Sequence, residues 1–379
     1  MIFQSPPKII YGKGTITSVG AATAKYGKKA MLVCGKGSLR KSGVLDIIVD
    51  SLEKAGVSYA VYDKIGSDPT VDDVNGGVLF AKENGADVLV AAGGGSPLDA
   101  AKGIGMMLTN KGVITDYEKA QPENPSLPII AIPTTAGTGS EATKYSVITD
   151  TERNIKMLLV SDGIIPKVAI LDYEITKSLP PFMTAATGMD AFTHALESYI
   201  NVNAQPITKL YSLEAIKLIS KSLIPAVLDG RNEQARGDML LAALYAGIAI
   251  CSSPTALVHS MSRPLGAHFH IPHGLANAML LSNVMEYNRP ACPELFRDIA
   301  IAMGENVEGL SVREASYAAI DAISALFDET GLPKTLSSQG VTEDKLPVLA
   351  ADALAAGSTK NNPRVPTVSE IETIYRSIF

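Results

Sequence analysis

The pattern of apolar residues changes near residue 180, and this change constrains the fold more than any other feature of the sequence. Before it, short continuous apolar runs lie at residues 30–34, 58–62, 87–92 and 127–132, and stretches with helical spacing separate them. Strands that are apolar on both faces and alternate with helices are typical of a parallel sheet covered on both sides. The sequence therefore predicts an α/β domain over residues 1–180.

The rest of the chain has only helical patterns. Within the first part, residues 41–55 and 71–84 carry helical spacing and are each followed by a glycine, as helix ends often are. After Pro180-Pro181 the strand signal disappears, and apolar-periodic segments follow at about 184–200, 206–229, 233–251, 274–286, 309–329 and 343–356. We expect an all-helical second domain over residues 181–379, with a ligand site between the two domains.

Composition excludes several classes of protein. Of the 379 residues, 46% are hydrophobic and 19% are charged, which is too apolar for a disordered chain. The 33 Lys and Arg against 39 Asp and Glu, with no basic block, give no support for a nucleic-acid partner. The start does not resemble a signal peptide, and the longest apolar run, 239–251, is shorter than the roughly 18 residues of a membrane span. With three scattered cysteines and no disulfide framework, we expect a cytoplasmic protein without a membrane partner.

Two glycine-rich loops follow predicted strands. Residues 93–97, Gly-Gly-Gly-Ser-Pro, come directly after the third apolar run and precede a helix. Residues 132–143, rich in hydroxyl and small side chains, follow the fourth run. Glycine lets the backbone approach an anion, and amide groups at a helix N-terminus point at it. A single triple glycine is often only a tight turn, but two such loops at neighbouring strand ends favour a dinucleotide site.

All five histidines lie between residues 194 and 273. Asp190 and His194 are four residues apart on a predicted helix and share one face, while His259 and His273 follow later. One carboxylate with three imidazoles is a complete ligand set for iron(II), zinc or a related divalent metal. Each of these residues could instead be an ordinary hydrogen-bonded side chain, and spacing alone does not decide between the two interpretations.

Four segments together resemble the iron-containing (group III) alcohol dehydrogenases. They are Gly-Gly-Gly-Ser-Pro-Leu-Asp-Ala-Ala-Lys at 93–102, the loop at 133–141, Gly-Met-Asp-Ala-Phe-Thr-His at 188–194 and Pro-His-Gly-Leu-Ala-Asn-Ala at 272–278. The resemblance extends over nearly the whole chain, in order and with family spacing. It implies a Rossmann-like N-terminal domain plus an all-α C-terminal domain, the dehydroquinate synthase-like architecture. It also implies an NAD(P)-linked alcohol dehydrogenase or aldehyde reductase with one Fe²⁺ and a small-molecule substrate, and we expect a homodimer because many members are homodimers.

The resemblance also implies roles for individual residues. The metal ligands for Fe²⁺, or for Zn²⁺ or another divalent metal in its place, would be Asp190, His194, His259 and His273. The residues that bind NAD(H) or NADP(H) would include Gly94, Gly95, Ser96, Asp99, Thr134, Thr135, Thr138, Ser140 and Lys156. In the implied mechanism the metal acts as a Lewis acid on the aldehyde oxygen, and the nicotinamide delivers a hydride.

The sequence departs from the family pattern at Arg263. Family members usually carry a histidine four residues after the third ligand, a residue often assigned to proton transfer, and Arg263 stands at that position here. Arginine cannot act as a general base near neutral pH, so His268, His270 or water would have to transfer the proton. Its planar cation suits a carboxylate, phosphonate or sulfonate, which favours a small anionic aldehyde such as sulfoacetaldehyde. Alternatively, Arg263 pairs with a neighbouring carboxylate, and the protein is a general short-chain alcohol or diol dehydrogenase.

A second departure concerns the choice of cofactor. NAD-preferring relatives often have an aspartate just after the first strand, where it binds the ribose hydroxyl and repels a 2′-phosphate. The corresponding segment here is Cys34-Gly35-Lys36-Gly37-Ser38. Gly35 removes the repulsion, and the Gly37 and Ser38 backbone could hold a phosphate. The sequence leaves the choice between NADH and NADPH open.

Two other classes of function fit less well. Dehydroquinate synthase-like lyases share the fold, but the basic residues that a phosphorylated sugar acid needs are missing. A cofactor-binding sensor without catalysis is disfavoured because all four ligand positions are filled.

Overall fold

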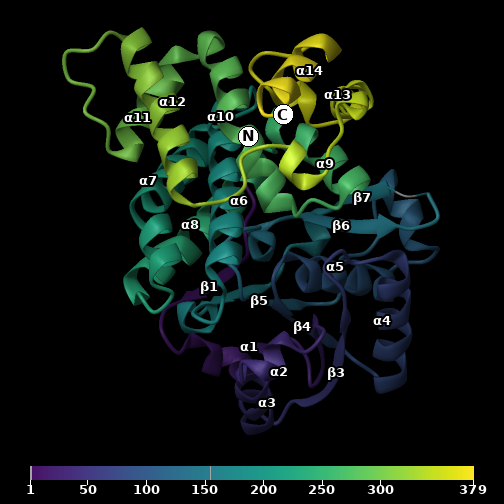
Figure 1. Cartoon of the computed structure of the whole chain (residues 1–379). Helices are drawn as coiled ribbons and strands as arrows, with labels where there is room; N and C mark the ends of the chain where they lie inside the picture. The colour runs from purple at the N-terminus through teal and green to yellow at the C-terminus, as the bar shows by residue number, and fades with distance from the viewer. Residues whose placement is uncertain (1, 154) are drawn as a thin grey trace. The chain divides into compact units, whose positions relative to one another are not determined.

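The chain folds into two compact units, which are described separately. The structure is a computed structural model that describes residues 2–153 and 155–379. The N-terminal unit comprises Gln4–Ser178, and the helical unit comprises Leu179–Phe379 together with Phe3, whose ring stacks on Tyr211 at 5.9 Å. The division at residues 178 and 179 falls two residues before the boundary expected from the sequence. Figure 1 labels the elements of both units.

In the described part of the N-terminal unit, six parallel strands form one sheet in the order β1-β8-β5-β4-β2-β3. The strands are β1 (Lys8–Tyr11), β2 (Lys29–Gly35), β3 (Ser58–Ile65), β4 (Val88–Gly93), β5 (Ile129–Pro133) and β8 (Val168–Leu171). A separate antiparallel pair consists of β6 (Tyr145–Asp150) and β7 (Ile155–Val160). The helices are α1 (Val19–Thr23), α2 (Ser38–Lys41), α3 (Val44–Lys54), α4 (Val71–Asn84) and α5 (Gly95–Thr109).

Strands β2, β4 and β5 are buried on both faces, as their continuous apolar runs predicted, whereas the edge strand β3 is partly exposed. In β2, Leu32 packs into a core cluster that includes Leu45 and Ile48 of α3. Its neighbour Met31 packs into a second cluster, which includes Leu98 of α5. Successive side chains of a strand point to opposite faces, so a strand between two layers of helices must be apolar at every position. The two clusters thus explain why these strands lack an alternating pattern.

The strand order identifies where a ligand binds to this kind of sheet. From β2 the chain proceeds to β3 on one side and then returns to β4 on the other side of β2. Open parallel sheets bind ligands at the carboxyl ends of the strands where the order reverses in this way. Cys34 and Ala92 pair at this end of β2 and β4. The predicted loops after β2, β4 and β5 therefore all lie at the edge that the topology favours.

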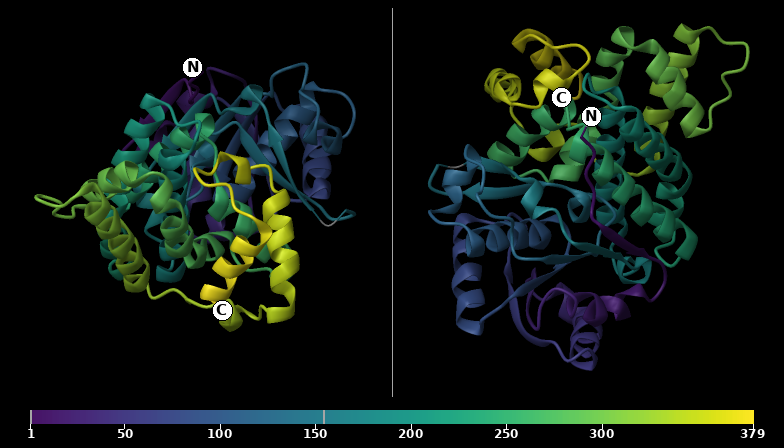
Figure 2. Two further views of the ribbon diagram at one scale, coloured as in Figure 1. Left: turned by 90° about the horizontal axis from the view of Figure 1, so that it is seen from above. Right: turned by 180° about the vertical axis from the view of Figure 1, so that it is seen from behind.

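The described part of the helical unit is built from nine α-helices and short 3₁₀ turns. They are α6 (Pro181–Ile200), α7 (Pro206–Leu228), α8 (Glu233–Ser252), α9 (Leu257–Phe269), α10 (His273–Asn288), α11 (Pro293–Met303), α12 (Val312–Glu329), α13 (Leu346–Ala355) and α14 (Val368–Ser377). Helices α6, α7 and α8 pack on one another, α11 packs on α12, and α13 packs on α14 (Figures 1 and 2). By length and composition α8 alone among the described helices could cross a membrane, but 83% of its most apolar window is buried in the protein, as in a core helix.

The sequence patterns missed several elements. Strands β1 and β8 have only four residues each, and β6 carries Ser146 and Thr149 among its apolar residues. Helix α9 contains Pro264, which interrupts the helical pattern. Helices α11 and α14 were also not expected, although both have a clear apolar face. Helix α4 has the predicted bounds, and its N-terminus is closed by a capping box between Thr70 and Asp73.

Candidate metal and cofactor sites

The two glycine-rich loops lie against each other at the favoured edge of the sheet. Gly94 is the N-cap of α5, and the helix begins at Gly95. A Cβ on Gly95 would come within 2.8 Å of Thr138 Cγ2, and a Cβ on Gly94 within 3.4 Å of Thr135 Cγ2. The glycines therefore allow the second loop to approach the start of α5, where free amide groups point outward. This arrangement suits a pyrophosphate, as predicted for Gly94, Gly95, Thr135 and Thr138.

Asp99 and Ser140 contribute to this arrangement from inside the protein. Ser140 Oγ donates to Asp99 Oδ1 at 2.6 Å, and the Val147 amide donates to Asp99 Oδ2 at 2.9 Å. The buried Lys102 ammonium donates to Ser140 Oγ at 2.9 Å and to the Tyr145 carbonyl at 2.7 Å. Both Asp99 oxygens and the Ser140 hydroxyl thus have partners within the protein. This network holds the second loop on α5, and the expected direct contact of these two residues with the cofactor stays a prediction.

The other predicted cofactor residues lie around the same strand ends. Thr134 donates its amide to the Gly93 carbonyl at 2.9 Å, and the Ser96 hydroxyl donates to the Ser67 carbonyl. Lys156, on β7, forms an ion pair of 2.7 Å with Asp68. After β2, the Gly37 amide donates to the Gly35 carbonyl at 2.8 Å.

The Gly37–Ser38 turn begins the short helix α2. Gly37 is the N-cap residue, with a φ of 82°, and Ser38 is the first residue of the helix. Because such a positive φ favours glycine, the turn depends on Gly37. The expected contacts of Gly35, Gly37 and Ser38 with a nucleotide remain predictions.

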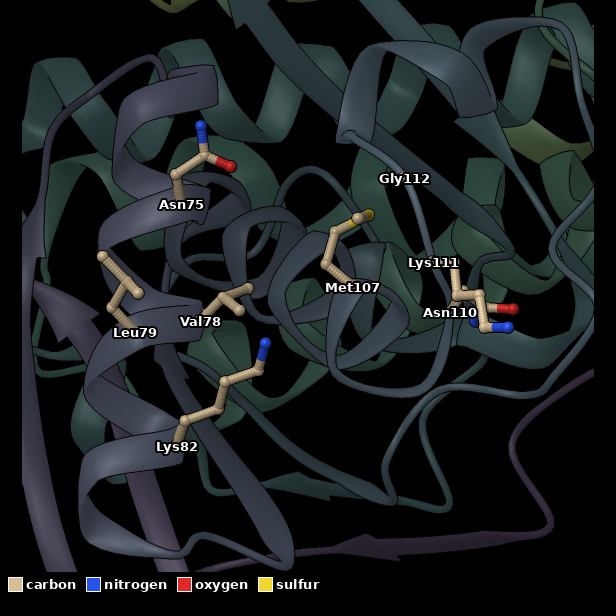
Figure 3. A pocket seen from close by; sticks show the side chains of 8 residues that line it. All are labelled: Asn75, Val78, Leu79, Lys82, Met107, Asn110, Lys111 and Gly112. Atoms are coloured by element: carbon tan, nitrogen blue, oxygen red, sulfur yellow. The ribbon is translucent and has the colours of Figure 1, made fainter.

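An open hollow of about 560 Å³ lies elsewhere on the N-terminal unit (Figure 3). Val78, Leu79 and Lys82 of α4 line it, together with Met107 and Asn110 at the far end of α5. A helix of 15 residues is about 22 Å long, so this hollow is separated from the loops at the start of α5. It is not the predicted cofactor site.

In the helical unit, the predicted ligands converge on one carboxylate oxygen. Asp190 and His194 lie one turn apart on α6, His259 lies in the first turn of α9, and His273 begins α10. Asp190 Oδ1 is 3.9 Å from His194 Nε2, 3.7 Å from His259 Nε2 and 3.6 Å from His273 Nε2. The ligand atoms of Asp190, His259 and His273 all lie within 4.8 Å of one another. His194 stands outside this group of three, but its ring stacks on His259 with centroids 4.6 Å apart.

Burial and neighbouring charges favour the metal-binding protonation states of His259 and Asp190. Burial lowers the pKa of His259, the neighbouring His194 and His273 lower it further, and the result is well below 6.5. Burial by itself would raise the pKa of Asp190, but the three imidazoles outweigh it and the pKa lies below its usual value. Neutral imidazoles and an ionised carboxylate are the forms that bind metals.

The geometry and the donor types fit a divalent metal. Asp190, His194 and His259 are almost completely buried, and His194 Nδ1 has no hydrogen-bond partner in the described structure. An oxygen donor with three nitrogen donors and no thiolate suits iron(II) or zinc and leaves coordination positions for a substrate. The residues expected from the sequence therefore form a group that fits Fe²⁺.

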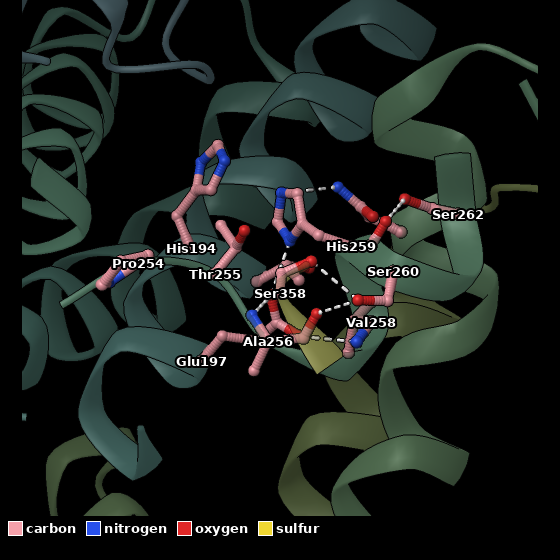
Figure 4. A network of polar contacts seen from close by, with 12 residues as sticks. His194, Glu197, Pro254, Thr255, Ala256, Val258, His259, Ser260, Ser262 and Ser358 are labelled. Atoms are coloured by element: carbon pink, nitrogen blue, oxygen red, sulfur yellow. Dashed lines mark hydrogen bonds and ion pairs between the residues drawn. The ribbon is translucent and has the colours of Figure 1, made fainter. Parts of the chain in front are cut away.

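Two residues that sequence reasoning missed support this cluster. Glu197, fully buried on α6, accepts a hydrogen bond of 2.6 Å from His259 Nδ1 (Figure 4). Asn277, fully buried on α10, donates to Asp190 Oδ1 at 2.7 Å, and its Nδ2 is 3.2 Å from both His259 Nε2 and His273 Nε2. The spacing contained a signal for both, because Glu197 is seven residues after Asp190 and Asn277 four after His273, which places each on the same helix face as a ligand.

Arg263 lies one turn after His259 on α9, so the two side chains share a face. Among the described residues no carboxylate comes within ion-pair distance of its partly buried guanidinium, and it has no hydrogen-bond partner. Burial lowers its pKa, which the charge of Glu197 raises in part. The pairing with a neighbouring carboxylate, one of the two alternatives drawn from the sequence, is therefore not observed.

His268 and His270 lie away from the cluster, and their expected role in proton transfer stays a prediction. His268 is nine residues beyond His259, about 13 Å along the helix and on its opposite face. It is exposed and contacts Asp352 at 3.0 Å. His270 is exposed at the end of α9 with a φ of 56°. In the described structure neither contacts the four candidate ligands through a hydrogen bond or a ring.

Comparison with known proteins extends these findings over the whole chain. A family model described as iron-containing alcohol dehydrogenase matches residues 6–173, and one for the C-terminal part of the Fe-containing alcohol dehydrogenase family matches residues 184–379. The 1,3-propanediol dehydrogenase of Klebsiella pneumoniae is 42% identical, covering 97% of this chain and 96% of the relative.

Solved structures agree with these sequence matches. The crystal structure of a 1,3-propanediol oxidoreductase superposes with a TM-score of 0.98 at 41% identity, covering 100% of this chain and 99% of the other. That of the sulfoacetaldehyde reductase from Bifidobacterium kashiwanohense, in complex with NAD⁺, superposes with a TM-score of 0.91 at 31% identity, covering 100% and 98%. The chain therefore belongs to the iron-containing alcohol dehydrogenase family and is an oxidoreductase.

Proposed function

We propose that this protein interconverts a small aldehyde and its alcohol, with a nicotinamide cofactor, and that the preferred aldehyde carries an anionic group such as the sulfonate of sulfoacetaldehyde. The observation that carries the proposal is Arg263, a partly buried cation one helical turn from His259 that has no carboxylate within ion-pair distance in the described structure and only the more distant charge of Glu197 to offset its own. Removing a guanidinium from water costs free energy unless an anion compensates. A substrate anion would supply that compensation.

The metal, the cofactor and the side chains would each supply a different part of the hydride transfer. Bound Fe²⁺ supplies a Lewis acid for the carbonyl oxygen, and the reduced nicotinamide supplies the hydride. Asp190 and the three imidazoles would hold the metal, and Arg263 would hold the charged end of the substrate in a two-point hydrogen bond. Because a guanidinium keeps its proton near neutral pH, Arg263 orients the substrate, and we assign the proton for the product oxygen to water.

A second candidate is a neutral short-chain alcohol or diol dehydrogenase. The observation that favours it is the 42% identity to the 1,3-propanediol dehydrogenase, which is higher than the 31% identity to the sulfoacetaldehyde reductase. In that case Arg263 would only contribute to the structure of α9.

Kinetics of matched variants separate the two candidates. The iron-loaded protein is assayed without oxygen on sulfoacetaldehyde, propanal and 3-hydroxypropanal, as wild type, Arg263→Ala, Arg263→Lys and Arg263→His. We expect wild type to prefer the anion, and Arg263→Ala to lower kcat/KM for it by roughly 100-fold while changing propanal little. Arg263→Lys should retain part of the preference, because it keeps the charge but loses the planar fork. If Arg263→Ala affects all three substrates equally, or if wild type prefers a neutral aldehyde, the anionic proposal fails.

A further inference from the structure

The carboxylate of Glu197 joins α6 to the start of α9. Oε2 accepts from the Ala256 amide at 2.9 Å and from His259 Nδ1 at 2.6 Å, and Oε1 accepts from the Val258 amide at 2.5 Å. Helix α9 has no capping side chain of its own at Ala256. Figure 4 shows Glu197 facing both the backbone of Ala256 and Val258 and the ring of His259. One buried carboxylate thus fixes the backbone before His259 and the orientation of its ring.

The contact with Nδ1 determines which ring nitrogen carries the proton. Burial raises the pKa of Glu197 to about 7, and the hydrogen bonds from the Ala256 and Val258 amides oppose this rise by stabilising the ionised form. The ionised carboxylate only accepts hydrogen bonds, so opposite it Nδ1 is the protonated nitrogen of a neutral His259. Nε2 then presents its lone pair, and Nε2 is the atom 3.7 Å from Asp190 Oδ1. The Asn277 amide agrees with this tautomer, because its Nδ2 must donate to Asp190 and also faces Nε2 at 3.2 Å.

We infer that Glu197 is a positioning residue of the iron site: by holding the Nδ1 proton of His259 and anchoring the first turn of α9, it keeps Nε2 of His259 available as a metal ligand. A histidine that ligates through one nitrogen commonly donates its other N–H to a carboxylate, and this contact increases its strength as a ligand. The inference rests on the family's use of a metal and is independent of which aldehyde the enzyme prefers. If Glu197 only capped α9, it would need its contacts with the Ala256 and Val258 amides but not its contact with the His259 imidazole.

The Glu197→Gln variant separates these roles. A glutamine has one carbonyl oxygen and an amide group that donates, so it cannot accept all three N–H groups. When its carbonyl oxygen takes the place of Oε1 and accepts from the Val258 amide, its NH₂ takes the place of Oε2, faces Nδ1 and favours the tautomer with the proton on Nε2. That tautomer cannot ligate through Nε2. The matched control is Asp238→Asn, which alters another buried carboxylate of the helical unit, one that accepts from Ser222 Oγ at 2.8 Å and from Gln234 Nε2 at 2.6 Å.

Two measurements on the full-length chain test the inference. The first is the ¹⁵N–¹H spectrum of metal-free protein labelled in its five histidines, assigned by single His→Gln variants, which reports the protonated nitrogen of each ring. The second is the affinity for Fe²⁺ and Zn²⁺ by competition with a chelator. We expect Nδ1–H for His259 in wild type, Nε2–H in Glu197→Gln, and metal binding weakened about 10- to 100-fold in that variant only.

Two kinds of result would overturn the inference on Glu197. Nε2–H at His259 in wild type would overturn the inference without any variant, so it remains testable even if Glu197→Gln does not fold. Metal affinity equal to wild type in Glu197→Gln, or weakened to the same extent in Asp238→Asn, would also overturn it.

Discussion

The contact between α10 and α6 at Gly274 gives the sharpest stability prediction. A Cβ built on Gly274 lies 2.3 Å from the Ala186 carbonyl oxygen and 2.8 Å from its carbon. Ordinary contact begins near 3.4 Å, so in Gly274→Ala one helix must retreat by about 1 Å. The opposing atoms are backbone, which cannot rotate aside as a side chain can. We expect a steric cost near 3 kcal/mol, offset by up to about 1 kcal/mol from the higher helix propensity of alanine.

The displacement should also reach the metal site. Gly274 follows His273 directly, and His273 Nε2 must stay near Asp190 on α6. Metal ligands tolerate changes of only about 0.2 Å, so a shift of about 1 Å in the first turn of α10 should release iron. The expected net loss of about 2 kcal/mol corresponds to a fall in Tm of roughly 4–8 °C for a unit of this size.

Thermal unfolding and iron content after gel filtration check both expectations. The matched control is Gly357→Ala in the same unit, where a Cβ would meet nothing within 4 Å, and it should keep the wild-type Tm and iron content. If Gly274→Ala matches wild type in both measurements, the close approach of α10 to α6 does not constrain the site and the reasoning is refuted.

Three further predictions concern the N-terminal unit. A Cβ on Gly35 has room, because its nearest atom would be the Ile65 carbonyl oxygen at 3.7 Å. Gly35→Asp should lower kcat/KM for NADPH relative to NADH by roughly tenfold, because the new carboxylate would repel a 2′-phosphate. An unchanged ratio would show that residue 35 does not face the ribose. Lys102→Met leaves the Asp99 carboxylate and the Tyr145 carbonyl without the buried cation. The variant should lower the free energy of unfolding in denaturant by about 3–5 kcal/mol. A loss below about 1 kcal/mol would contradict a role of Lys102 in the loop network. Burial raises the pKa of Glu141 from 4.5 to about 7, so the folded state binds this proton more tightly than the unfolded chain does. The contribution of this proton to the free energy of unfolding is therefore fully present below pH 4.5 and is lost as the pH rises through about 7. Glu141→Gln should therefore gain stability relative to wild type as the pH rises, by roughly 3 kcal/mol at pH 8.5, and a difference between the two proteins that stays constant from pH 4.5 to 8.5 would disprove this.

Local patterns in the sequence determined the parts of the fold that depend on neighbouring residues. The continuous apolar runs predicted β2, β4 and β5 because a strand buried on both faces must be apolar at each position, and the run at 58–62 predicted the edge strand β3. Helix α4 was predicted with its observed bounds because its helical spacing and its final glycine are both local signals, and the capping box that the structure adds at its start is also local. Helical spacing placed Asp190 and His194 on one face, and the resemblance to the family supplied His259 and His273.

Only the tertiary structure decided the features whose partners are distant in sequence. Pro264 obscured α9, and the carboxylate that caps it comes from Glu197, about 60 residues earlier on another helix. The environment of Arg263 depends on which carboxylates the fold brings close to it, and the spacing of residues in the sequence does not reveal those carboxylates. The same holds for His268, which packing directs to Asp352 rather than to the metal ligands. Periodicity describes the face on which a side chain lies, but hydrogen bonds and burial depend on what the rest of the chain places opposite that face.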